Sequence, residues 1–373
     1  MTQWFTESFR AEFEKQAAEL GRVNIAVFGK TGVGKSTLVN AIFGAPVAPT
    51  GIGAPVTVGS HLYLDARGSL GVIDSHGLEI GRDDDEFIKD LTKMVRESRR
   101  KPIDEQIHLA WYCVRGMDRR FEDAEERLIK TLDDLGLPVI CVLTQVPMRE
   151  GRFHPDAVAL AQHIEARRLP IYGGRPFLTY AMRDQFTDQP AYGLTELLEG
   201  TFRLTPDAVQ GALVAAQQID LGLKAGRSKA AIAAAVTAAA AAAAVPIPFS
   251  SAAVLVPIQL SMMARIAHLH GLGLDRSALL AVASTSAATA AGRAATAGLL
   301  KFLPGAGSIA GGVINASVAS SFTFAMGQAW LAVCRRAQTG ALPLLDGRLD
   351  TAAVRGLFEA EMAKRLPRIK TAS

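Results

Sequence analysis

The stretch that decides the fold lies near the N-terminus and reads Gly29-Lys30-Thr31-Gly32-Val33-Gly34-Lys35-Ser36, followed by Thr37. It fills every fixed position of the pattern G-x-x-x-x-G-K-[ST]. An apolar run at 23–28 precedes it, and a segment with helical periodicity begins at Lys35. Glycines let such a turn wrap tightly, so that successive backbone N–H groups point inward at an anion. The helix N-terminus adds positive charge, and the stretch therefore predicts a loop that holds the phosphates of a nucleotide.

Two side chains of this loop have predicted chemical roles. Lys35 is expected to reach the β- and γ-phosphates, where its ammonium would offset negative charge. The hydroxyl of Ser36 is expected to ligate Mg²⁺. Because the motif is complete and lies between a strand and a helix, a glycine turn without a ligand is the weaker interpretation.

A second element follows the apolar run 70–74 and reads Asp74-Ser75-His76-Gly77. It resembles the D-x-x-G that closes a strand in GTPases. The Asp74 carboxylate is expected to hold Mg²⁺ through water, and the Gly77 N–H to contact the γ-phosphate. His76 is a candidate for orienting the attacking water, although a histidine in such a loop is more often simply exposed.

A threonine between the first helix and the next strand is expected to complete the magnesium site. Thr57 is preferred because it directly precedes the strand expected at 61–65. Thr50 is the competing candidate.

Strand-like and helix-like segments alternate over the first half of the chain. Strands are expected at 23–28, 61–65, 70–74, 107–114, 138–143 and 176–180, and helices at 35–43, 83–99, 121–135, 155–167 and from 194 onward. Repeated βα units predict an α/β domain with a mostly parallel sheet and helices on both faces. The hairpin 61–74 adds one antiparallel edge strand.

The composition changes after Gly226, where small residues dominate. No residue in 230–264 or in 302–334 is charged, and both stretches are long enough to cross a bilayer. Alanine contributes little to membrane insertion, however, and prolines interrupt both stretches. A bundle of closely packed helices and a pair of membrane hairpins both stay open. The expected divisions are an amphipathic helix at 1–22, the nucleotide domain at 23–207, an all-α hydrophobic domain at 208–340 and a basic amphipathic tail at 341–373.

The N-terminal helix carries Phe5, Phe9 and Phe13 at a spacing of four residues. It is expected to dock on the body of the protein, and a membrane or partner anchor is the alternative. The basic end of the tail is interpreted as a solvated terminus, with attraction to anionic lipid as the alternative.

The cysteines and the net charge limit the cellular compartments and the kinds of partner to expect for this protein. Three cysteines without paired spacing indicate buried free thiols and a reducing compartment, so a cytoplasmic location is expected, with the inner face of the membrane as an option. The net charge of +4 is mild, and no nucleic-acid recognition module is present.

Together these residues make the chain resemble the Era/septin/immunity-related branch of Ras-like P-loop GTPases. More closely, it looks like bacterial GTPases in which such a domain is fused to a YcjF-type hydrophobic helical domain. The likeness is carried by 29–44, 111–114, 142–145, 260–263, 270–271 and 301–307. The resemblance implies GTP and GDP as ligands with Mg²⁺, hydrolysis that repositions the helical domain, and a homodimer across the nucleotide face.

The base-reading positions depart from that family. Where the family has N/T-K-x-D, this chain has Thr144, Gln145, Val146 and Pro147. A proline cannot replace the carboxylate that pairs with guanine, so an ATPase or purine-promiscuous NTPase is the alternative function. The resemblance also implies that the Ala181 N–H bonds the guanine O6.

The catalytic positions depart as well. Leu78 stands where Ras-like enzymes carry a water-orienting glutamine, which predicts slow hydrolysis without a partner. Arg119 and Arg120 are candidates to act across a dimer, or are solvated loop residues. Gly32 replaces the asparagine of potassium-activated relatives.

A third interpretation is a nucleotide-regulated membrane-inserting protein with incidental turnover, based on the two uncharged stretches.

Overall fold

The computed structural model describes residues 2–44, 55–57, 60–65, 67–74, 84–186, 188–244, 251–272, 316–345 and 348–365. The chain falls into two compact units. The α/β unit runs from Leu20 to Leu221, and the helical unit joins Met1–Glu19 to Gly222–Ser373. This division differs from the expected one: the N-terminal helix belongs to the helical unit, whereas 208–221 belongs to the α/β unit.

Within the described residues, the α/β unit contains a seven-stranded sheet in the order β2-β3-β4-β1-β5-β6-β9. Its strands are β1 (Val23–Phe28), β2 (Pro55–Thr57), β3 (Ser60–Leu64), β4 (Leu70–Asp74), β5 (Leu109–Arg115), β6 (Val139–Thr144) and β9 (Phe177–Leu178). From β4 to β9 all neighbours are parallel, while β3 runs antiparallel to both β4 and β2. The mostly parallel sheet is therefore confirmed. The short β2 lies outside β3, so the antiparallel strand is next to the edge rather than at it.

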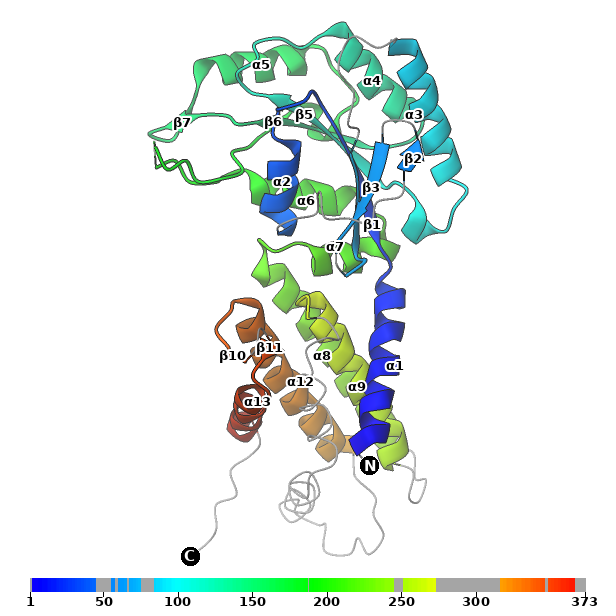
Figure 1. Cartoon of the computed structure of the whole chain (residues 1–373). Helices are drawn as coiled ribbons and strands as arrows, with labels where there is room; N and C mark the ends of the chain where they lie inside the picture. The colour runs from blue at the N-terminus through cyan, green and yellow to red at the C-terminus, as the bar shows by residue number, and fades with distance from the viewer. Residues whose placement is uncertain are drawn as a thin grey trace, which may run out of the picture. The chain divides into compact units, whose positions relative to one another are not determined.

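Helices cover both faces of this sheet, as predicted (Figure 1). One face packs against α3 (Asp84–Ser98), α4 (Asp123–Asp134) and α5 (Pro155–Ala166). The opposite face packs against α2 (Lys35–Phe43), α6 (Leu194–Leu204) and α7 (Gln210–Ala216). Because both faces are covered, β1 and β6 are buried along their whole length, which explains their continuous apolar runs.

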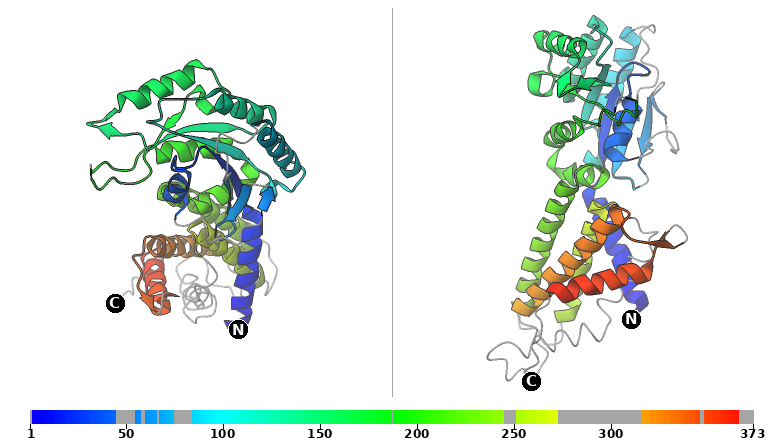
Figure 2. Two further views of the ribbon diagram at one scale, coloured as in Figure 1. Left: turned by 45° about the horizontal axis from the view of Figure 1, so that its top comes forward. Right: turned by 90° about the vertical axis from the view of Figure 1, so that its left-hand side faces the viewer.

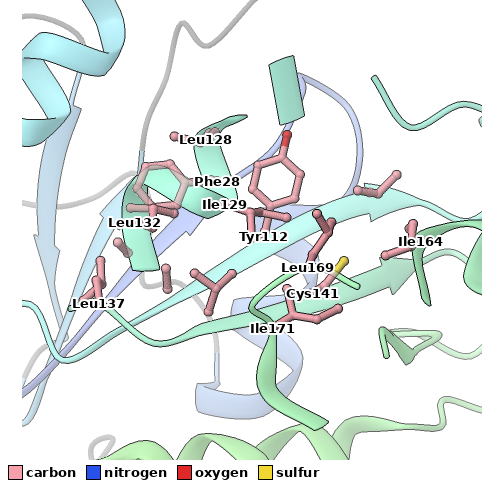
Figure 3. Packing of buried hydrophobic residues seen from close by; sticks show 14 of the residues in the cluster. Phe28, Tyr112, Leu128, Ile129, Leu132, Leu137, Cys141, Ile164, Leu169 and Ile171 are labelled. Carbon is pink, nitrogen blue, oxygen red and sulfur yellow. The ribbon is translucent and has the colours of Figure 1, made fainter. Parts of the chain in front are cut away.

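Figure 3 shows the first of these faces from close by, with Tyr112 of β5 and Cys141 of β6 beneath Ile129 of α4. Short elements connect the larger ones: η1 (Ile103–Glu105), η2 (Tyr172–Gly174), η3 (Asp207–Val209) and a hairpin of β7 (Met148–Arg149) with β8 (Arg152–Phe153). This hairpin was not expected from the sequence.

The main hydrophobic core in the described part of the helical unit draws on each of its long helices. These are α1 (Thr2–Leu20), α8 (Leu221–Ala244), α9 (Ser251–Leu269), α12 (Ala316–Gln338) and α13 (Thr351–Arg365), and a short hairpin of β10 (Leu344–Leu345) with β11 (Arg348–Leu349) precedes α13 (Figure 2). A smaller cluster lies between α8, α9 and α12. Small residues bring the helices close: a Cβ on Gly327 of α12 would lie 2.7 Å from the Ile232 side chain of α8. The indole of Trp330 is buried and donates a hydrogen bond to the Met263 carbonyl (2.8 Å).

Of the two uncharged stretches, 230–244 lies in α8, 251–264 in α9 and 316–334 in α12, while 245–250 and 302–315 lie outside the described residues. Among the helices in the described part of the chain, none combines the length and the apolar character that a membrane crossing needs.

Candidate nucleotide-binding site

The phosphate-binding loop connects β1 to α2 and depends on glycine at defined positions. Gly29, Gly32 and Gly34 have φ values of +135°, +82° and +94°, in the region that favours glycine. A Cβ on Gly29 would lie 2.2 Å from the backbone oxygen of Cys113 on β5, so a side chain cannot fit there. Around Gly32, by contrast, no described heavy atom lies within 4 Å of a Cβ position. The loop is thus closed against the sheet at its start and open at its middle.

Lys35, the first residue of α2, reaches back over this loop. Its Nζ donates to the backbone oxygens of Gly29 (2.8 Å) and Lys30 (3.2 Å). The ammonium therefore lies at the loop that leads into the first turn of α2. Positive charge and free helix-end N–H groups in one place form an anion-binding site.

The predicted magnesium ligands lie at the same edge of the sheet. Asp74 is the last residue of β4, and its partner on β1 is Val27, two residues before the loop. Thr57 of β2 pairs with Ser60, and the next residue of β3, His61, pairs with Asp74. The side chains of Thr57 and Asp74 lie outside the described part of the structure, but together with Ser36 in the first turn of α2 the backbone positions bring three residues of oxygen-bearing types to this edge. Such hard oxygen donors fit Mg²⁺.

Several predicted residues cannot be placed. His76, Gly77, Leu78 and Thr50 lie outside the described residues. Arg119 is described and pairs with the carboxylate of Asp156, although its own side chain is mostly exposed.

The end of β6 is bound to the phosphate-binding loop. The Thr144 hydroxyl donates to the backbone oxygen of Val33 and lies 3.2 Å from that of Val114. The Gln145 amide donates from Nε2 to the backbone oxygen of Gly32 (3.2 Å), and its backbone has a φ of +52°. The structure thus brings Thr144 and Gln145 to the loop, where they support it from the side expected to bind the base.

The loop after β9 lies beside the same end of β6. The Thr179 N–H donates to the Leu143 oxygen (2.8 Å), and the Val146 N–H donates to the Thr179 oxygen (3.1 Å). Ala181 follows two residues after Thr179, and its side chain is partly buried against the apolar cluster that includes α2 and α6. The segments that carry the residues predicted to contact the base, Thr144, Gln145 and Ala181, therefore lie side by side at the end of β6.

Two acidic residues at the start of α4 were not expected to take part. The Lys30 ammonium lies 3.2 Å from the Glu122 carboxylate and 3.9 Å from that of Glu125. Glu125 is buried, and it accepts a hydrogen bond from the Glu122 N–H (2.7 Å). Burial raises its pKa, while nearby Lys30 opposes the rise. Glu125 stands at the third position of α4, where a capping box carries Glu, although Glu122 occupies the N-cap position where that motif has Ser or Thr.

Tyr112 completes this group. It is buried on β5 and hydrogen-bonds the Glu125 carboxyl, and burial together with that carboxyl raises the pKa of its hydroxyl. In Figure 3 its hydroxyl points away from the strands. The loop is therefore tied to β6 on one side and to α4 on the other.

Residues 24–145 match the model of a family described as 50S ribosome-binding GTPase. The match begins in β1, includes the phosphate-binding loop and Asp74, and ends at Gln145, so it covers less than half of the chain. With the fold and the loop geometry, it supports a P-loop GTPase domain, the class of protein that binds and hydrolyses GTP. No characterised protein was found to match the chain.

Proposed function

We propose that this protein is a Mg²⁺-dependent GTP-hydrolysing switch in which the nucleotide state of the α/β unit sets the conformation of the helical unit. The observation that carries the proposal is the phosphate-binding loop itself. Lys35 folds over it, and Thr144 and Gln145 hold it through the backbone oxygens of Val33 and Gly32. A turn that merely connected a strand to a helix would need none of these contacts.

In this proposal, Lys35 and the N–H groups of the loop hold the β- and γ-phosphates and stabilise the charge that develops as water attacks in line. Bound Mg²⁺ would neutralise further charge on the same oxygens, and Ser36, Thr57 and Asp74 would hold it. Hydrolysis is slow because Leu78 offers no group to orient water.

The switch output follows from how the chain connects the units. Two residues separate the end of α1 at Leu20 from β1, whose other end carries the phosphate-binding loop, and the α/β unit ends at Leu221, the first residue of α8. A change at the loop therefore has two covalent routes to the helical unit. A homodimer across the nucleotide face, lipid contact through the basic tail and a cytoplasmic location stay predictions.

Equilibrium binding of fluorescent GDP and turnover of GTP by the full chain test the nucleotide site. Lys35→Ala should weaken binding about tenfold or more and abolish turnover, because charged hydrogen bonds contribute about 1.5–3 kcal/mol each. Lys101→Ala removes an exposed lysine and serves as the control. Turnover that persists in EDTA, or a Lys35→Ala protein that binds like the wild type, would contradict the proposal.

Hydrogen exchange tests the switch. Peptides from α8, α9 and α12 should differ in protection between the GDP complex and the complex with a non-hydrolysable GTP analogue. Identical protection in the two complexes would contradict the proposed effect of the nucleotide on the helical unit, while GTP hydrolysis itself would still stand.

A further inference from the structure

The backbone around Pro147, where the family has its guanine-reading carboxylate, is already hydrogen-bonded within the protein. The Pro147 oxygen accepts from the His154 N–H (2.8 Å), which closes the base of the β7–β8 hairpin. The next N–H, that of Met148, donates to Oε1 of Gln189 (2.8 Å). The backbone oxygen of Pro147 is thus already hydrogen-bonded within the hairpin.

The carbonyl of Val146 is engaged twice. It accepts from the Tyr192 hydroxyl (2.6 Å) and from Nε2 of Gln189 (3.3 Å). Because Gln189 bonds Met148 through its oxygen and Val146 through its nitrogen, both ends of this buried amide are committed. Neither Val146 nor Gln189 can therefore replace the carboxylate that Pro147 lacks without breaking contacts that hold the hairpin.

Two other polar side chains at this edge, Gln145 and Asp184, also make hydrogen bonds within the protein. Gln145 donates to the phosphate-binding loop. Asp184, a carboxylate in the loop after β9, accepts from the Phe186 N–H (2.9 Å) and hydrogen-bonds the Tyr180 hydroxyl. This carboxylate stabilises its own turn.

We propose that the site recognises the triphosphate and accepts adenine and guanine nucleotides alike, with a preference for guanine of less than about tenfold. The inference rests on the proposed function, because it concerns the same site. A site discriminates strongly when a buried polar group would be left unpaired by the wrong ligand. Here the residue at the position that would distinguish the two bases is a proline, and the acceptors nearest to it, the backbone oxygens of Val146 and Pro147 and Oε1 of Gln189, already accept hydrogen bonds within the protein. Affinity then comes from the phosphates, which both nucleotides share.

Displacement of fluorescent GDP from the full chain by unlabelled GDP and ADP tests this directly. The two competitors should differ by less than about tenfold, a factor that corresponds to 1.4 kcal/mol. Lys35→Ala should weaken both equally, because both use the same phosphate site. A wild-type preference for GDP of tenfold or more would overturn the inference while leaving the proposed function in place. Failure of fluorescent GDP to bind the wild-type chain at all would instead overturn the proposed function.

The variant Pro147→Asp places a carboxylate at this position. It should raise the preference for GDP over ADP at least about tenfold above the wild-type ratio, as expected for a charged acceptor that pairs with guanine alone. Pro147→Ala makes the same change to the backbone without the carboxylate and should keep the wild-type ratio. An unchanged ratio in a folded Pro147→Asp protein would show that this position does not face the base. If that variant fails to fold, the wild-type ratio decides.

Discussion

Gly29 and Gly32 lie in the same loop with similar backbone requirements and very different surroundings. Both have positive φ, but only at Gly29 would a Cβ meet a backbone atom, the Cys113 oxygen at 2.2 Å. Backbone on two adjacent strands cannot move aside as a flexible side chain does. The two motif positions thus differ in role: Gly29 lets the loop pack on the sheet, whereas Gly32 lies where the loop has open space around it.

Alanine substitutions should separate the two effects. Gly32→Ala should cost only the strain of a left-handed residue, about 1 kcal/mol of unfolding free energy. Gly29→Ala adds the collision and should cost roughly 3 kcal/mol or more. Urea unfolding of the two variants measures the difference. Equal losses would mean that β5 yields at Cys113.

At the scale of elements, α4 supports the loop through Lys30. Both side chains of the Lys30–Glu122 pair are about a third exposed, so the pair should contribute no more than about 1 kcal/mol. Lys30→Ala should therefore weaken GDP binding by less than about tenfold, in contrast to Lys35→Ala. A double-mutant cycle with Glu122→Gln should show effects that are not additive. Additive effects would show that the pair does not support nucleotide binding.

His270, just after α9, links three helices of the helical unit. Its Nδ1 lies 2.7 Å from Oε1 of Gln338, and its Nε2 lies 3.2 Å from the Ser228 hydroxyl. Burial lowers its pKa to about 4, and the nearby charges of Lys224 and Arg335 act in the same direction. The folded protein therefore binds this proton less readily than the unfolded chain, whose histidine titrates near 6.5.

The sign of the pH effect follows. Stability due to neutral His270 is complete above pH 6.5 and is lost as the pH falls toward 4, by at most about 3 kcal/mol. Urea midpoints at pH 7.5 and 4.5 should differ less in His270→Gln than in the wild type. His163→Gln, on the exposed surface of α5, should keep the wild-type difference. If both variants behave alike, another group is responsible.

The sequence predicted the large elements and missed the small ones for a physical reason. Continuous apolar runs in β1, β5 and β6 reflect burial on both faces, and this signal is strong. The strands β7 and β8 are two residues long, too short for any periodicity, and their pairing depends on distant Gln189 and Tyr192. Resemblance pointed to Thr144 and Gln145 only as base-reading positions, so their hydrogen bonds to the phosphate-binding loop were not predicted. The capping pair Glu122 and Glu125 had no predicted partner either. The roles of the candidate site residues stay predictions.

At the scale of the whole molecule, the structural units are not continuous in sequence, because α1 belongs with the C-terminal helices. The apolar face of α1 was expected to dock on the protein, and Phe9 and Phe13 are indeed buried in the core of the helical unit. Phe13 also stacks on the ring of His268 (3.7 Å between centroids), whose Nε2 lies 2.7 Å from the Phe13 oxygen. This partnership joins residues 255 positions apart in the sequence, which periodicity cannot reveal.

Phe13→Ala should therefore destabilise the helical unit by about 3–5 kcal/mol, the usual cost of emptying a buried aromatic site. Hydrogen exchange should show lost protection in α9 and α12, with that of β5 and β6 unchanged. Phe186→Ala, at a residue that is 95% exposed, should alter neither. Protection lost in both units would mean that they unfold together.

The joining of Met1–Glu19 with Gly222–Ser373 has a consequence for biosynthesis. Chains are made from the N-terminus and their domains generally fold as units, so α1 is made well before the helices that share its core. The whole α/β unit, by contrast, is complete once Leu221 has been added. During that interval the apolar face of α1 has no α9 or α12 to cover it. In the growing chain α1 is thus an exposed apolar segment open to aggregation, and a chaperone that shields it would act before the helical unit exists.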